Sequence, residues 1–222
     1  YDNGLMNGTS SATFSPETTM DRAMLVTVLY RMDGSKKAVG ETPLSDVAPN
    51  GYFYDALVWA YQSKIINGTS DTQFSPHIPI SREMMVTIFY RYALHIGRDV
   101  SKKDSLQPFN DAASISSYAV TPFMWAVANS ILFGTSSVEL SPMGTATRAQ
   151  CAAVLQRFIP WTKGESLGEH KHTYSSVRVE ATCVKDGYTI YTCSCGFSYK
   201  SDYVSARGHN WGAWKVVTEA TT

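Results

Sequence analysis

A repeated motif constrains this chain more than any other feature of its sequence. The stretch Gly4-Leu-Met-Asn-Gly-Thr-Ser10 recurs with small changes at Lys64–Ser70 and Ser130–Ser136, spaced by 60 and then 66 residues. A Ser-Pro pair follows each copy, and an Arg lies six residues after each Pro. Self-similarity at a nearly fixed period is typical of a chain built from equivalent structural units. The sequence therefore predicts three repeats.

Each complete repeat is predicted to hold two helices joined by a turn. Apolar residues at helical spacing predict a first helix over residues 52–63 in one repeat and 118–129 in the next. The second helices are predicted to begin at Asp21, Ser81 and Thr147, because these residue types are favoured N-caps. The first repeat is predicted to lack its first helix, since the chain begins where that helix would end.

Composition and charge exclude several classes of protein. Lys plus Arg and Asp plus Glu both number 19, and a net charge of zero argues against nucleic acid as a partner. No apolar run approaches the roughly 20 residues of a membrane helix, so no membrane insertion is expected. Only 17% of the residues are charged and 12% are aromatic, a composition that resembles secreted proteins that face carbohydrate. We therefore expect an extracellular protein.

The repeats resemble the S-layer homology (SLH) family in several spaced motifs. Its F-x-D-V opening is matched twice, by Leu44-Ser-Asp46-Val47 and Phe109-Asn-Asp111-Ala112. The tryptophan of its first helix is matched by Trp59 and Trp125. Its T-R-A-E position is matched three times, by Asp21-Arg-Ala-Met24, Ser81-Arg-Glu-Met84 and Thr147-Arg-Ala-Gln150. The resemblance covers residues 1–160 and implies a mainly α fold, a pseudo-threefold helical bundle of three repeats.

The resemblance also implies a function. Family members hold acidic secondary cell-wall polysaccharide, often through a pyruvylated sugar, in the grooves between repeats. They thereby anchor surface proteins non-covalently to the cell wall of Gram-positive bacteria. The carbohydrate-binding residues implied here are Arg22, Arg82, Arg148, Asp46, Asp111, Trp59 and Trp125. The implied location is the cell wall or surface layer.

The residues themselves support an anion site at the T-R-A-E arginines. An Arg directly after an N-cap is unfavourable for an isolated helix, whereas free N–H groups, the helix dipole and a guanidinium together attract an anion. Asp21 lies beside Arg22 and could neutralise it, so the groove that uses Arg148 is favoured over the one that uses Arg22.

Two alternative interpretations stay open for these side chains. Each motif Arg could pair with Asp46 or Asp111 of the neighbouring repeat, and the tryptophans could belong to the core instead of stacking on sugars. A second arginine series lies near the helix C-termini, where Arg suits the dipole, and is interpreted as structural. It comprises Arg31, Arg91 and Arg157.

The chain changes character after residue 161. The predicted domains are 1–42, 43–107 and 108–161 for the repeats, 162–168 for a polar linker, and 169–222 for a small β-rich module. Apolar runs on either side of a Lys-Asp-Gly turn predict its strands. A second copy of the module is predicted to begin near residue 209. The module at residues 169–222 resembles a Cys/His-containing cell-surface repeat module of anaerobic Gram-positive bacteria.

A module of this size needs a metal site or a disulfide to stabilise its fold, because it can bury little apolar surface. A structural Zn²⁺ would supply this stabilisation in a zinc-ribbon-like site, since thiolate and imidazole are the ligands that zinc selects. The candidate ligands are Cys183, Cys193, Cys195, His209 and His172. The alternative is a disulfide from Cys183 to Cys193 or Cys195, which an oxidising exterior would favour.

Three classes of function compete. The repeated N-cap-plus-Arg motif favours a cell-wall anchor. A structural surface-layer or filament subunit is the alternative, in which self-association lets a neighbouring chain complete the first repeat. No enzymatic activity is expected, because the sequence holds no G-x-S-x-G, H-E-x-x-H or phosphate-loop motif.

Overall fold

The computed structural model describes residues 4–10, 12–35, 40–165, 173–193 and 198–209. The chain divides into two compact units, residues 1–171 and 172–222. The first unit contains the repeats, and the second contains a small sheet. Among the described residues, no helix has the length and apolar character needed to cross a bilayer.

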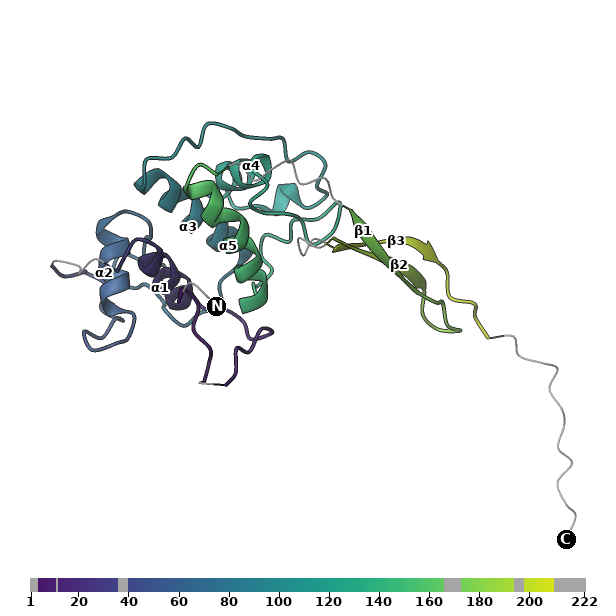
Figure 1. Cartoon of the computed structure of the whole chain (residues 1–222), viewed down its shortest axis with the longest axis horizontal. Coiled ribbons are helices and arrows are strands. Elements are labelled where there is room, and N and C mark those ends of the chain that lie inside the picture. The colour runs from purple at the N-terminus through teal and green to yellow at the C-terminus, as the bar shows by residue number, and fades with distance from the viewer. Residues whose placement is uncertain (1–3, 11, 36–39, 166–172, 194–197, 210–222) are drawn as a thin grey trace, which may run out of the picture. The chain divides into compact units, whose positions relative to one another are not determined.

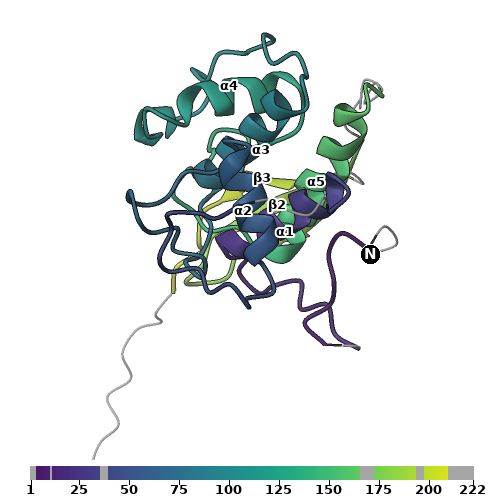
Figure 2. The same cartoon turned by 90° about the vertical axis from the view of Figure 1, so that its left-hand side faces the viewer.

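The first unit contains two kinds of helix (Figures 1 and 2). The second helices of the three repeats are α1 (Arg22–Met32), α3 (Arg82–His95) and α5 (Arg148–Thr162). The first helices are α2 (Tyr54–Gln62) in the second repeat and α4 (Val120–Ala128) in the third, where a short 3-10 turn spans Ala112–Ser114. Helix α2 packs against α1, and α4 packs against α3.

The predicted N-caps are confirmed, and they explain where the long helices start. Asp21, Ser81 and Thr147 have extended backbones, and their side chains accept hydrogen bonds from the amides of Met24, Met84 and Gln150. In α5 the Gln150 side chain also accepts from the Thr147 amide, which completes a capping box. These bonds satisfy amides that the first turn of a helix leaves without partners.

A closed ring of backbone hydrogen bonds joins the three repeats. The Met20 amide donates to the Ala146 carbonyl, Ala146 to Ile80, and Ile80 back to Met20, at 2.9 to 3.0 Å. All three side chains are fully buried. The residue before each N-cap therefore fixes its repeat to both others.

The Gly-Thr turn between the helices of a repeat depends on the absence of a side chain. A Cβ on Gly68 would lie 2.1 Å from the Ser70 carbonyl oxygen and 2.5 Å from that of Gln73. The chain passes this close because the Thr69 amide donates to the Gln73 carbonyl at 2.7 Å. Gly8 and Gly134 have equivalent surroundings. The Gly of this turn is therefore a packing requirement in every repeat.

The prediction of a mainly α fold is wrong. The described residues form five α-helices and a three-stranded antiparallel sheet, and most of them lie in neither helices nor strands. The physical reason lies in the repeats. Residues 63–81 and 129–147, which join the two helices of a repeat, are longer than either helix that they join. Their backbone groups bond within turns and to neighbouring repeats instead of extending helices.

The second unit holds the predicted β-structure in a form that differs from a zinc ribbon. Strands β1 (Tyr174–Val179), β2 (Gly187–Cys193) and β3 (Ser198–Val204) form an antiparallel sheet in that order. Val177 pairs with Ile190, and Ile190 pairs with Lys200. Among the described residues, no group of three His, Cys, Asp or Glu side chains is placed to hold a metal. The zinc-ribbon-like form of this prediction is therefore not what the structure shows.

Candidate functional site

The three T-R-A-E arginines act as clamps between repeats. Each is only 6% exposed and donates two hydrogen bonds to backbone carbonyls of the next repeat. Nε and Nη2 of Arg22 reach the Phe74 and Asn67 carbonyls at 3.0 Å. Those of Arg82 reach the Leu140 and Phe133 carbonyls at 2.7 and 2.6 Å. Those of Arg148 reach the Phe14 and Asn7 carbonyls.

This pattern runs from the first repeat to the second, from the second to the third, and from the third back to the first. Arg22 also lies over the Phe74 ring at 4.4 Å, and Arg148 over the Phe14 ring at 4.6 Å, distances that allow cation–π attraction. The motif arginines therefore hold the repeats together, and two donors of each are committed to the protein.

The aspartates of the F-x-D-V opening bind the backbone. Asp46 accepts hydrogen bonds from the Phe74 and Ser75 amides at 2.8 and 2.6 Å. Asp111 does the same for Leu140 and Ser141. Neither carboxylate forms an ion pair with a motif Arg in the part of the chain that the structure describes. Each instead holds the Phe-Ser or Leu-Ser segment whose carbonyl receives the Arg.

Both candidate tryptophans lie in the core. Trp59 is 7% exposed and packs against Tyr30 and Tyr92. Trp125 is fully buried between Tyr90 and Trp161, and its Nε1 has no hydrogen-bond partner among the described residues. A sugar ring cannot reach the face of Trp125 in this arrangement.

A groove with a volume of about 400 Å³ lies where the three repeats meet. The first repeat contributes Arg22 and the third contributes Tyr118. The second repeat contributes the rest of the lining, which is Ile66, Asn67, Gly68, Thr69, Met84, Thr87, Ile88 and Arg91. The groove thus combines the Gly-Thr turn of one repeat with the clamp of its neighbour.

Two guanidinium groups give this groove a positive charge. Burial lowers the pKa of Arg22 and of Arg91, and each remains a cation because a guanidinium keeps its proton in proteins. Arg31 and Arg157 donate to the Leu5 and Ile131 carbonyls of their own repeats. The Arg91 side chain makes no such bond to any described residue. It therefore has its full set of donors available to a ligand.

Asp21 does not neutralise Arg22. Its Oδ1 accepts the N-cap bond from the Met24 amide, and its Oδ2 lies 3.3 Å from Nδ1 of His77. No ion pair joins Asp21 to Arg22 within the described ranges. The reason for favouring the Arg148 groove over the Arg22 groove is therefore absent from the structure.

A buried carboxylate lies behind the groove. Glu83, which is 3% exposed, accepts from the Ser116 amide at 3.1 Å, the Ser116 hydroxyl at 3.0 Å and the Tyr118 hydroxyl at 2.7 Å. Burial and the bond to Glu83 raise the pKa of Tyr118 to about 12, so the phenol stays protonated at neutral pH. Glu83 thereby fixes a side chain of the third repeat at the groove.

Sequence reasoning missed Arg91, Tyr118 and Glu83 as site residues. Arg91 belongs to the arginine series that is interpreted as structural from the sequence. The hydrogen bonds to backbone carbonyls support that interpretation for Arg31 and Arg157 and not for Arg91. A usable signal existed for Glu83. It occupies the third motif position, where the other two repeats have Ala23 and Ala149. A charged residue at one of three equivalent positions, where the other two repeats have alanine, indicates a local role.

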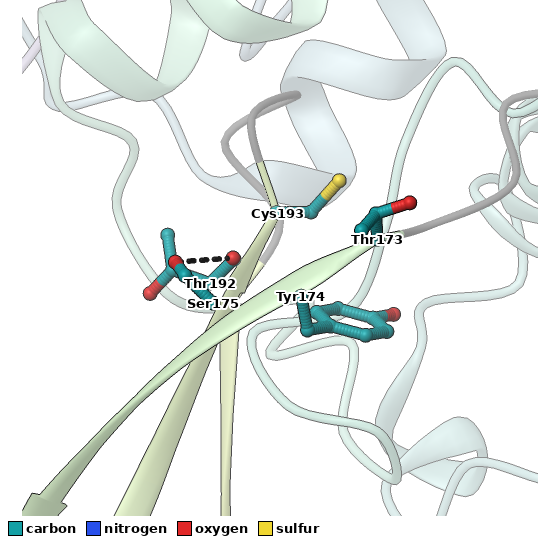
Figure 3. A pocket seen from close by; sticks show the side chains of 5 residues that line it. All are labelled: Thr173, Tyr174, Ser175, Thr192 and Cys193. Carbon is teal, nitrogen blue, oxygen red and sulfur yellow. Dashed lines mark hydrogen bonds between the residues drawn. The ribbon is translucent and has the colours of Figure 1, made fainter.

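The candidate metal ligands are only partly described. Cys195 and His172 lie outside the described residues. Cys183 and His209 are exposed, and Cys183 is a free cysteine. Cys193 is buried and lines a cavity of about 450 Å³ with Thr173, Tyr174, Ser175 and Thr192 (Figure 3). Zinc ligation and a disulfide involving Cys195 therefore both stay predictions.

Known proteins share the repeat region. The model of the S-layer homology domain matches residues 43–83 and 108–152. The chain is 25% identical to an endoglucanase of Bacillus sp. (strain KSM-635), over 82% of this chain and 18% of that protein. It is 27% identical to a surface-layer 125 kDa protein of Lysinibacillus sphaericus, over 71% and 13%. It is also 27% identical to exoglucanase XynX of Acetivibrio thermocellus, over 68% and 14%.

These matches confirm the SLH resemblance for two repeats and give a location. The matched ranges contain both F-x-D-V openings and the motif arginines Arg82 and Arg148. SLH domains occur in surface-layer proteins and surface enzymes, where they mediate attachment to the cell wall. The matches indicate the bacterial cell surface or cell wall as the location. The chain spans less than a fifth of the length of each of these three relatives.

Proposed function

We propose that this chain attaches a surface protein to the bacterial cell wall by holding an acidic wall polysaccharide in the groove at Arg22 and Arg91. The observation that carries the proposal is the hydrogen bonding and burial of the Arg91 guanidinium. Its guanidinium lines the groove, is half-buried, and makes no hydrogen bond to a described residue. A fork of N–H donors in such a setting suits a carboxylate or phosphate group.

The two cations have different roles in this proposal. Arg22 has committed Nε and Nη2 to backbone carbonyls, so it contributes mainly charge and the shape of the groove. Arg91 has its donors available and makes the direct contact with the anionic group. The part of the groove that is lined by Asn67 and Ile88 receives the sugar ring.

The relatives support an attachment role. They include two enzymes that act on glucans by name and one surface-layer protein, and the region shared with this chain is a small part of each. We therefore assign no catalysis to the repeats. The cargo is the remainder of a longer surface protein.

Calorimetric titration of wall polysaccharide released from bacterial cell walls tests the proposal. Arg91→Met is expected to weaken binding at least tenfold, because a charge-assisted hydrogen bond contributes about 1.5–3 kcal/mol. Lys102→Met is the matched control, since it removes one exposed positive charge outside the groove. Equal affinities for the two variants and the wild type would refute the assignment of Arg91.

The surface-layer relative supports a second candidate, a subunit that assembles through its repeats. Sedimentation velocity at increasing protein concentration separates the two. An assembling subunit forms species heavier than the 24.5 kDa monomer, whereas an anchor stays monomeric.

A further inference from the structure

The Glu83–Tyr118 pair also joins two repeats, but it occurs at one of the three repeat boundaries, whereas an arginine clamp occurs at each. It joins the first turn of α3 to the segment that precedes α4, and it ends at the groove. Burying a carboxylate costs free energy unless donors surround it, and three donors converge on this one. The other two repeats fold with alanine at this position. The carboxylate is therefore a feature of this one groove.

The direction of the hydrogen bond decides what the groove offers to a ligand. Glu83 is an acceptor, so the Tyr118 hydroxyl must donate its only proton to it. The phenol oxygen then keeps lone pairs and no proton, and it can only accept from a ligand. Arg91 can only donate. The groove therefore pairs a cationic donor with a neutral acceptor.

We propose that Glu83 is a positioning residue that sets Tyr118 as a hydrogen-bond acceptor, so that the groove selects a compact ligand carrying both an anionic group and a hydroxyl group. Such a ligand is an acidic sugar. This inference rests on the proposed function of the same groove, and it adds which chemical groups the ligand must present. A simple anion satisfies Arg91 and leaves Tyr118 without a donor.

Glu83→Gln reverses the polarity of Tyr118 with almost no change of shape. The Ser116 amide faces Oε2 and can only donate, so the oxygen of the new amide must take that place. Its NH₂ group then occupies the position of Oε1, which faces the Tyr118 hydroxyl. Tyr118 accepts from this NH₂ group and turns its own proton toward the groove. The variant also loses a negative charge, so it favours a bare anion.

Two probes read this polarity, D-glucuronate and sulfate. Glucuronate carries hydroxyl groups beside its carboxylate, whereas sulfate has no donor. Their dissociation constants are measured by NMR titration of the full chain at constant ionic strength. We expect the wild type to prefer glucuronate and Tyr118→Phe to weaken glucuronate about fivefold with sulfate unchanged. Glu83→Gln should lower the ratio of glucuronate affinity to sulfate affinity about tenfold, which corresponds to about 1.4 kcal/mol.

Tyr52→Phe and Arg91→Met are the controls. Tyr52 precedes α2 as Tyr118 precedes α4, but Ala23 stands where a carboxylate would be, so its variant should leave the ratio unchanged. Arg91→Met should weaken both probes and thereby place them in this groove. A structural role of Glu83 would weaken both probes together, and that parallel loss would overturn the proposal.

The two proposals can fail separately. A wild type that binds neither probe refutes the hydroxyl-plus-anion selectivity, while Arg91-dependent binding of the polysaccharide would leave the anchor intact. A chain that shows the expected probe ratios but ignores wall polysaccharide refutes the anchor and leaves the polarity of the groove established.

Discussion

Arg82→Met and Arg91→Met, two substitutions on the same helix, should separate the clamp from the ligand contact. Arg82 donates to the Leu140 and Phe133 carbonyls at 2.7 and 2.6 Å, whereas Arg91 makes no hydrogen bond to the described residues. Methionine keeps an unbranched apolar side chain in each place and removes only the guanidinium.

The expected cost follows from the two carbonyls that lose their donor. A buried acceptor without a partner costs about 1–3 kcal/mol, so the pair costs at most about 2–6 kcal/mol, because the bond to the Phe133 carbonyl is only partly buried. Burial also lowers the pKa of Arg82 to about 10, which shows that the folded state bears a desolvation cost that methionine removes. We therefore expect a loss of about 3 kcal/mol in the free energy of unfolding. For a unit of this size that loss lowers Tm by about 6–12 °C.

Urea unfolding followed by tryptophan fluorescence measures this loss, because Trp59 and Trp125 lie in the core of the repeat unit. Arg91→Met should stay within about 0.5 kcal/mol of the wild type, as substitutions without defined contacts usually do. The reasoning is refuted if Arg82→Met costs less than about 1 kcal/mol, or if the two variants cost the same.

Three further predictions concern stability and metal binding. Gly68→Ala should cost more than about 2 kcal/mol in urea unfolding, because its Cβ would lie 2.1 Å from the Ser70 carbonyl oxygen. Gly34→Ala, at φ +84° with open space around it, should cost about 1 kcal/mol. Equal losses for the two variants would contradict the packing argument. Burial raises the pKa of the Cys151 thiol to about 12 from 9.0, so the unfolded chain loses the thiol proton at a lower pH than the folded chain. The free energy of unfolding should therefore fall as pH rises from 9 to 12, and less steeply in Cys151→Ala. A free energy of unfolding that does not change over this range would contradict the argument. Native mass spectrometry of the reduced chain should find one Zn²⁺, lost on Cys183→Ser; metal-free protein at equimolar Zn²⁺ would contradict zinc ligation.

The repeat pattern predicts the caps and the turns because these depend on local chemistry. Asp21, Ser81 and Thr147 begin their helices as their residue types indicate. The mainly α prediction failed because helical spacing says nothing of the long connections. Those segments find their hydrogen-bond partners in other repeats, as Met20 does with Ala146. A sequence read one repeat at a time does not show this ring.

The sequence predicts where the site lies, but it does not predict the role of each side chain in it. The sequence locates Arg22 at a boundary between repeats, but the carbonyls that occupy Nε and Nη2 lie 52 and 45 residues away. Arg91 differs from Arg31 and Arg157 only in what surrounds it in three dimensions. Burial of Trp125 likewise depends on Tyr90 and Trp161. Such roles require the contacts between repeats.

Sedimentation of the purified chain with bacterial wall sacculi tests the central claim most directly. The measurement compares intact sacculi with sacculi stripped of their secondary polysaccharide, using wild type and Arg91→Met. The account predicts that the wild type sediments only with intact sacculi and that Arg91→Met stays largely in solution. Sedimentation that persists after stripping, or that Arg91→Met does not weaken, would contradict a polysaccharide-binding groove at Arg91.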